Sequence, residues 1–278
     1  MSGGRPRAGG RVSYLYAVLP RPAGDRLPRP LTGLADAPVH LVGHGRLAAA
    51  VSALPADDHD EQALRAHLED LDRLTAMARA HHRVVERLSA LGPVLPFRLA
   101  TVYLDDARVR AVLRASADDF AEALTRLDGR VELGVKVFAL GGPPEGAPAP
   151  APPPAPGASA APGSGAAYLA RRRAERRLRE ETWQRAARLA GRLDDELRPL
   201  AEAGRALRPQ RAEPAGAAGV AGENVWNHAY LLRAERTEAF TALVRALAAG
   251  EDGLRVEVTG PWAPYSFAAP PEPGGVPS

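Results

Sequence analysis

The chain has 278 residues, of which 45% are hydrophobic and 25% charged, with a formal net charge of +3 and no cysteine. This length fits one large domain or two of ordinary size, and the composition is that of a soluble globular protein. The lack of cysteine excludes disulfides, thiol catalysis and thiolate metal sites, and no apolar run approaches the roughly 20 residues that span a bilayer. No apolar secretory stretch follows the amino terminus, so we expect a cytoplasmic protein that binds no membrane.

The first half of the chain indicates an N-terminal α+β domain over residues 11–129, after a disordered tail at 1–10. A buried strand is predicted from Val12 to Leu19, and the segments 39–42 and 47–54 are typical of a hairpin. Their connection, Gly43-His-Gly-Arg-Leu-Ala48, also matches the dinucleotide fingerprint G-x-G-x-x-G/A. The hairpin is favoured because Pro55 follows too soon for the helix that would bind a pyrophosphate.

The rest of this domain is predicted from periodicity and from helix caps. Apolar residues three or four apart predict a long helix over residues 60–91, which Gly92-Pro93 ends. Residues 94–103 are interpreted as a strand, at an edge or with a bulge because of Pro96. Asp105 and Asp106 then cap a helix or helix pair that reaches Leu127.

The second half predicts a C-terminal domain over residues 130–268, before a disordered tail at 269–278. Its pattern is strand, long helix, strand, strand, helix, strand, which is the order of a modified ferredoxin-like βαββαβ sheet. The predicted elements cover 131–138, 169–200, 203–207, 225–232, 235–249 and 254–259. Residues 141–166 are almost entirely Pro, Ala, Gly and Ser, which predicts a flexible insert.

Candidate chemistry is sparse. No nucleophile stands beside a base, no Walker A sequence occurs, and the seven histidines form no ligand set. We therefore expect no enzyme, no catalytic residue, no metal and no cofactor. Arg98 is the exception within an apolar segment, because a guanidinium there requires a carboxylate partner, a ligand or an exit to solvent.

The end of the second domain concentrates aromatic residues in a chain that holds only 5% of them. Trp262, Tyr265 and Phe267 follow one another within six residues, beside Pro261 and Pro264. Large aromatic side chains supply much contact area at low entropic cost. The segment therefore predicts either a packed corner of the domain or a surface for a partner, and the two interpretations are compatible.

Arginines are concentrated in the first turns of the long helix that is predicted in the second half of the chain. Those between 171 and 179 could contact an acidic partner or RNA, but the interleaved Glu175, Glu180 and Glu181 favour a solvated face. We therefore expect no nucleic-acid partner. A basic nucleic-acid- or ligand-binding α+β module remains the alternative function.

Several segments together resemble one known family, the gas vesicle proteins GvpL/GvpF. The resemblance covers about residues 12–268 and includes Tyr14–Val18, Val51–Pro55, Pro93–Thr101, Glu132–Val137, Asn227–Leu232 and, above all, Gly260-Pro-Trp-Ala-Pro-Tyr-Ser-Phe267. The chain departs from the family's usual Leu-Pro-Leu-Arg-Phe-Gly-Thr at Phe97, Leu99 and Ala100. The long Pro/Ala insert is also atypical.

The resemblance implies a two-domain α+β protein that is a minor accessory component of gas vesicle formation and not an enzyme. It implies binding to the gas vesicle shell protein and to other accessory proteins, and a location at gas vesicles in the cytoplasm. Arg98, Trp262, Tyr265 and Phe267 are then the candidate partner-contact or signature residues. The resemblance decides neither between the F and L branches nor the oligomeric state.

Overall fold

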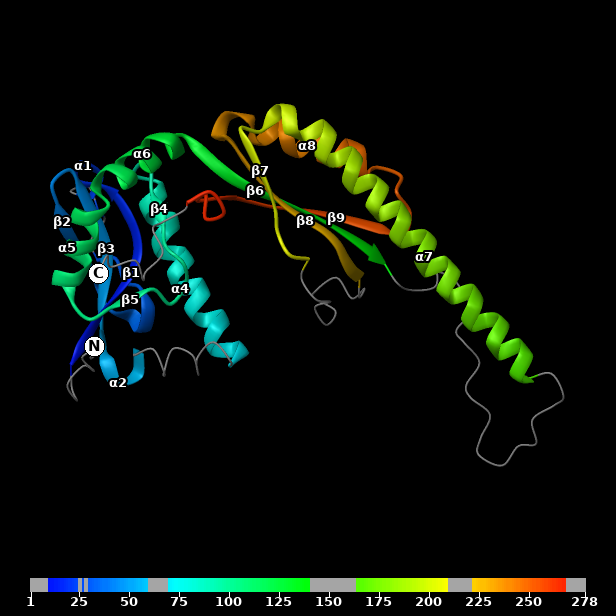
Figure 1. Cartoon of the computed structure of the whole chain (residues 1–278), viewed down its shortest axis with the longest axis horizontal. Helices are drawn as coiled ribbons and strands as arrows, with labels where there is room; N and C mark the ends of the chain where they lie inside the picture. Colours follow the sequence, from blue (N-terminus) through cyan, green and yellow to red (C-terminus); the bar gives the residue numbers. More distant parts are fainter. Residues whose placement is uncertain are drawn as a thin grey trace. The chain divides into compact units, whose positions relative to one another are not determined.

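The computed structural model describes residues 10–24, 27, 30–59, 70–140, 164–209 and 222–268. The chain divides into two compact units, one of Met1–Glu132 with Pro261–Ser278 and one of Leu133–Gly260 (Figure 1). The sequence pattern instead predicts a second domain that extends to residue 268. In the structure the aromatic segment at the end of that range belongs to the first unit.

The first unit is built around an antiparallel sheet in the order β2-β3-β1-β4, with β5 also paired to β1. Its strands are β1 (Arg11–Pro20), β2 (Val39–His44), β3 (Leu47–Pro55), β4 (Leu95–Pro96) and β5 (Val102–Tyr103). Its helices are α1 (Arg21–Gly24), the 3-10 turn η1 (Leu34–Asp36), α2 (Ala56–His59), α4 (Leu71–Ser89), α5 (Asp106–Ala115) and α6 (Ala117–Leu127). The mixture of helices and antiparallel sheet confirms the α+β class.

The predicted hairpin is confirmed. Strands β2 and β3 pair in antiparallel register down to His44 opposite Leu47, and Gly45 in the connection has a φ of 56°. A positive φ suits glycine because it has no Cβ to clash with the backbone. The glycines therefore make a turn between two strands, and no helix follows them to hold a pyrophosphate.

The prediction of one strand over residues 94–103 is wrong. The chain pairs with β1 through β4, turns at Leu99 and Ala100, and pairs with β1 again through β5. Ala100 has a φ of 64°, and Thr101 donates its N–H to the Arg98 carbonyl at 3.3 Å, which closes the turn. Sequence alternation gave no sign of this turn because the apolar run continues through it.

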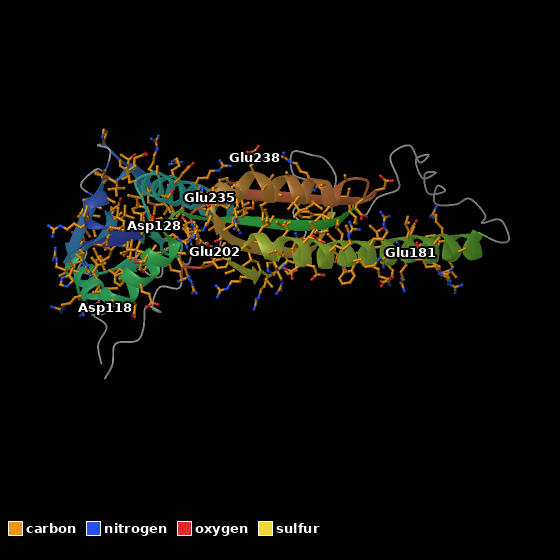
Figure 2. The ribbon with its side chains drawn as sticks, turned by 90° about the horizontal axis from the view of Figure 1, so that it is seen from above. Asp118, Asp128, Glu181, Glu202, Glu235 and Glu238 are labelled. Carbon is orange, nitrogen blue, oxygen red and sulfur yellow. The ribbon has the colours of Figure 1, made fainter. Side chains whose placement is uncertain are left out.

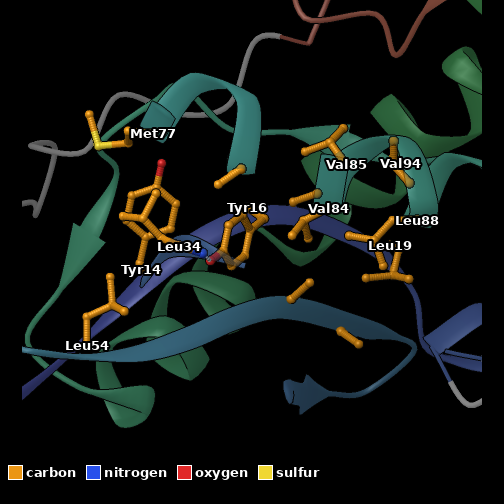
Figure 3. Packing of buried hydrophobic residues seen from close by; sticks show 14 of the residues in the cluster. Tyr14, Tyr16, Leu19, Leu34, Leu54, Met77, Val84, Val85, Leu88 and Val94 are labelled. Atoms are coloured by element: carbon orange, nitrogen blue, oxygen red, sulfur yellow. Dashed lines mark hydrogen bonds between the residues drawn. The ribbon is translucent and has the colours of Figure 1, made fainter. Parts of the chain in front are cut away.

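The core of the first unit lies between α4 and the sheet (Figure 3). Tyr14 and Tyr16 of β1 are fully buried, as are Val84, Val85 and Leu88 of α4. The side chain of Asp70 caps α4 by accepting the N–H groups of Asp72 and Arg73. Residues 60–69, where the sequence predicts the start of this helix, lie outside the described residues.

The second unit contains a four-stranded sheet in the order β7-β8-β6-β9. Its elements are β6 (Arg130–Leu140), α7 (Ser164–Leu197), η2 (Arg198–Leu200), β7 (Ala203–Ala206), β8 (Gly222–Arg233), η3 (Ala234–Arg236), α8 (Thr237–Ala248) and β9 (Leu254–Trp262). The predicted succession of strands and longer helices is thus observed. Most of the predicted insert, residues 141–163, lies outside the described part of the chain.

Only the second half of α7 packs against this sheet. Its buried residues are Ala186, Leu189, Ala190, Leu193 and Leu197, whereas every residue from 168 to 181 is exposed. Figures 1 and 2 show the first half of the helix extending past the strands of the same unit. Among the described helices, none is both long and apolar enough to cross a membrane.

Candidate interaction surface

The segment Pro261–Ala268 consists of the last two residues of β9 and the tight turn that follows them. Tyr265 donates its N–H to the Ala263 carbonyl at 2.8 Å, and Ala268 donates its N–H to the Pro264 carbonyl at 2.8 Å. Two prolines in the segment favour such a turn because each fixes its own φ and restricts the residue before it. We call Pro261–Ala268 the C-terminal clasp, since it folds back onto the first unit.

A buried carboxylate fastens the clasp. Glu132 is 8% exposed, and its two oxygens accept the N–H of Ser266 at 2.7 Å and the hydroxyl of Ser266 at 2.6 Å. Arg126 also donates to the carbonyl of Phe267 at 3.2 Å. A carboxylate away from water needs such partners, and hydrogen bonds to a charged oxygen are stronger than neutral ones. The clasp is therefore held by specific polar contacts as well as by its aromatic residues.

The aromatic residues of the clasp meet two histidines of α4. The Tyr265 ring lies 6.1 Å from the His81 ring, and the Trp262 ring lies 4.7 Å from the His82 ring in an edge-to-face arrangement. Burial raises the pKa of the Tyr265 hydroxyl, and the nearby Tyr14 and Glu132 raise it further. Trp262 keeps 40% of its surface exposed. One aromatic side chain is thus packed inward while the other is presented to solvent.

Beneath the clasp lies His81, a histidine of α4 that is buried. The Ala100 N–H donates to the Tyr14 hydroxyl at 3.2 Å, so that hydroxyl is free to donate to Nδ1 of His81 at 2.9 Å. Burial lowers the pKa of His81 to about 4, with a smaller opposing effect of the nearby Phe97 backbone. Its position on the apolar stripe of α4, three residues before Val84, accounts for that burial.

The four candidate residues do not form one cluster. Trp262, Tyr265 and Phe267 share the clasp, and Phe267 is half-buried. Arg98 follows β4, and its side chain is exposed, so the guanidinium reaches solvent. No hydrogen bond or ion pair of that side chain is recorded within the described residues.

The remaining polar clusters join elements of the fold. In the first unit Asp106 accepts the Ser13 hydroxyl at 2.6 Å and contacts Nε2 of His40 at 2.9 Å. In the second unit Asp194 accepts the Tyr230 hydroxyl at 2.9 Å and pairs with Arg198. Within the described residues, no group of three or more acidic or histidine side chains could hold a metal ion. These contacts tie helices to sheets.

Comparison with known proteins agrees with this architecture. The family model described as "Gas vesicle synthesis protein GvpL/GvpF" matches residues 12–269. The chain is 48% identical to gas vesicle protein L of Streptomyces sp. (strain CB03234), with 93% of each chain covered. It is 30% identical to gas vesicle protein F of the same strain, covering 92% of this chain and 98% of that protein. The chain therefore belongs to the GvpL/GvpF family.

Solved structures share the fold at lower identity. The gas vesicle protein GvpF from Anabaena sp. PCC7120 matches with a TM-score of 0.60 and 20% identity, over 94% of this chain and 97% of that one. GvpF from Microcystis aeruginosa matches with a TM-score of 0.58 and 18% identity, over 93% and 99%. At these identities the likeness concerns the fold.

Proposed function

We propose that this chain is a gas vesicle accessory protein, a minor component that acts in vesicle formation and assembly. Its match to the family model over residues 12–269 carries this proposal, supported by the names of its relatives. The location proposed with it is the cytoplasm, in association with gas vesicles. No catalytic step is part of the proposal.

The proposed activity is binding of the hydrophobic gas vesicle shell protein and of other accessory proteins. A subunit that polymerises through apolar surface needs that surface covered before assembly. In this proposal Trp262 supplies an exposed aromatic contact, and the packed Tyr265 fixes the backbone that presents it. Exposed aromatic residues held rigidly are typical of residues that dominate binding energy.

The test is capture of purified shell protein by the full chain. We expect Trp262→Ala to weaken capture severalfold, while Leu104→Ala leaves it unchanged. Leu104 is a matched control because it lies in the same unit and is 45% exposed, against 40% for Trp262. Equal capture by both variants would remove the clasp from the interface. No capture by the unmodified chain would contradict the shell-binding proposal itself.

We also propose that the two units are separate domains and that the second is a modified ferredoxin-like domain. The strand order β7-β8-β6-β9, together with the succession strand, helix, strand, strand, helix, strand, supports this assignment. A fragment of residues 133–260 that unfolds cooperatively on its own would support it. A fragment without a cooperative transition would contradict it.

A further inference from the structure

One ridge of α7 changes character halfway along the helix. In its second half the ridge consists of buried residues in steps of three and four, namely Leu197, Leu193, Ala190 and Ala186. The same steps continue toward the amino terminus through Trp183, Arg179, Arg176, Arg172 and Leu169. We call these last five residues the basic ridge. On a helix with 3.6 residues per turn these five residues share one side of α7, and that side is turned away from the buried face, which continues through Thr182 and Glu175.

The basic ridge is exposed and positively charged. The side chains of Arg172 and Arg179 are 66% and 73% exposed. Arg179 pairs with Glu223 at 2.8 Å and Arg172 approaches Glu175 at 3.7 Å, but no ion pair of Arg176 is recorded in the described part of the chain. Residues 168–181 hold six arginines and three glutamates, a net charge of +3. Leu169 and Trp183, at the two ends of the ridge, are exposed apolar side chains.

We propose that the basic ridge binds an acidic amphipathic helix of a partner protein. Steps of three and four residues are the spacing at which one helix packs along another. Leu169 and Trp183 are fourteen residues apart, about 21 Å along the axis, so the partner helix spans about four turns. Its carboxylates face the three arginines in the middle turns, and its apolar residues cover the two ends. Arginine favours carboxylates because its planar fork donates two parallel hydrogen bonds.

The charge of the ridge decides against other occupants. A second copy of the chain would place the same arginines against one another, and like charges in contact are costly. The chain's own Pro/Ala-rich residues 141–163 contain a single acid, Glu145, and cannot complement the ridge. A nucleic acid carries negative charge but no aliphatic side chains to cover Leu169, and the test below distinguishes it from a helix. An acidic helix with apolar ends matches both the charge and the exposed Leu169 and Trp183.

This inference goes beyond the proposed function, and its test involves no gas vesicle component. The probe is a synthetic three-heptad helical peptide with glutamates at the central ridge-facing positions and leucines at both ends. We expect Trp183 emission in the full chain to shift to shorter wavelength when the peptide binds. Trp183→Phe removes that shift. A peptide with glutamine in place of the glutamates is expected to bind at least about tenfold more weakly.

The decisive variants are Arg176→Glu and Arg188→Glu. Both make the same charge change at exposed positions of α7, but Arg188 lies on another face of the helix. We expect Arg176→Glu to weaken peptide binding by about tenfold or more, and Arg188→Glu by less than about twofold. A peptide with lysine opposite position 176 should restore binding to Arg176→Glu. Far-ultraviolet circular dichroism checks that both variants keep their helix content.

Three outcomes would overturn the proposal. Equal weakening by Arg176→Glu and Arg188→Glu would show attraction to overall charge and not to the ridge. Self-association of the full chain that Arg176→Glu abolishes would assign the ridge to a second copy. Binding of single-stranded RNA in preference to the peptide, with a steep salt dependence, would assign it to a nucleic acid.

Discussion

Helices α4 and α7 show what becomes of an amphipathic helix when its stripe is apolar and when it is basic. Residues Met77, His81, Val84, Val85 and Leu88 of α4 are buried and pack toward the sheet of the first unit. In α7 residues are buried only from Ala186 onward, and the exposed residues earlier in the helix are rich in arginine. The helix forms in both cases, but only an apolar stripe is covered.

The two regions are therefore stabilised by different interactions. Burying a large apolar side chain contributes about 1.5–3 kcal/mol, whereas an exposed ion pair along a helix contributes about 0.2–0.5 kcal/mol. Substitutions near Tyr14 and Tyr16 should change the free energy of unfolding by whole kilocalories. Substitutions in the first half of α7 should change the free energy of unfolding by only tenths of a kilocalorie per mole.

The largest effect is expected at Gly33. A Cβ added there would lie 2.0 Å from the Tyr16 hydroxyl, which accepts the Leu34 N–H and donates to Ser52. Gly33→Ala must displace that buried ring, so we expect a loss of about 3 kcal/mol or more in the free energy of unfolding. Urea unfolding measures it. The contrasting variant is Gly191→Ala in α7, where a Cβ meets nothing within 4 Å. It should gain about 0.5–1 kcal/mol, and similar losses for both would contradict the contrast.

The next effect is a dependence of stability on pH. The folded-state pKa of His81 is about 4, below its ordinary value of 6.5, because burial disfavours the charged ring. The unfolded chain therefore binds the proton more readily between these values. The contribution is fully present above pH 6.5 and is lost as pH falls toward 4, by about 3 kcal/mol in total.

Urea unfolding at several pH values between 7 and 4 measures this slope. The surrounding Tyr14, Tyr16 and Tyr265 stay neutral throughout, since burial raises the pKa of each above its ordinary value of 10. His81→Leu should be less stable at pH 7 because the Tyr14 hydroxyl loses its acceptor, but its slope should be shallower. An unchanged slope in His81→Leu would show that another group is responsible.

A smaller effect, of opposite sign, is expected at Ala100. This residue holds a φ of 64°, where an L side chain is strained and glycine is not. Ala100→Gly should therefore raise the free energy of unfolding by about 1 kcal/mol. The Ala100 N–H bond to the Tyr14 hydroxyl should persist. A loss of stability in this variant would mean that the alanine methyl group makes packing contacts that outweigh the strain.

Much of the fold follows from the spacing of apolar residues, which is three or four in helices and two in strands. The hairpin around Gly45, the helix pair capped by Asp105 and the succession of elements in the second half could all be predicted this way. These features depend on local chain geometry. The turn at Ala100 could not be predicted, because it depends on two separate pairings with β1 that no local pattern encodes.

The candidate surface was predictable in part. The aromatic content of the segment Trp262–Phe267 marked it as packed or exposed, and the structure shows Tyr265 packed and Trp262 partly exposed. That the segment belongs to the first unit could not be read from sequence. The contact between Ser266 and Glu132 joins residues 134 positions apart. No sequence pattern near a buried carboxylate indicates which distant residue will bind it.

The smallest effect is expected at Glu175, and it tests whether the first half of α7 is exposed to solvent. Glu175 lies 3.7 Å from both Arg171 and Arg172, and all three side chains are more than half exposed. Water and salt screen such pairs, so Glu175→Gln should lower the free energy of unfolding by no more than about 0.5 kcal/mol. Glu196→Gln, at an exposed position farther along α7, controls for the change in net charge. A loss above about 1 kcal/mol, specific to Glu175, would mean that this half of the helix is already packed against something. The basic ridge would then be unavailable to the acidic helix we propose for it.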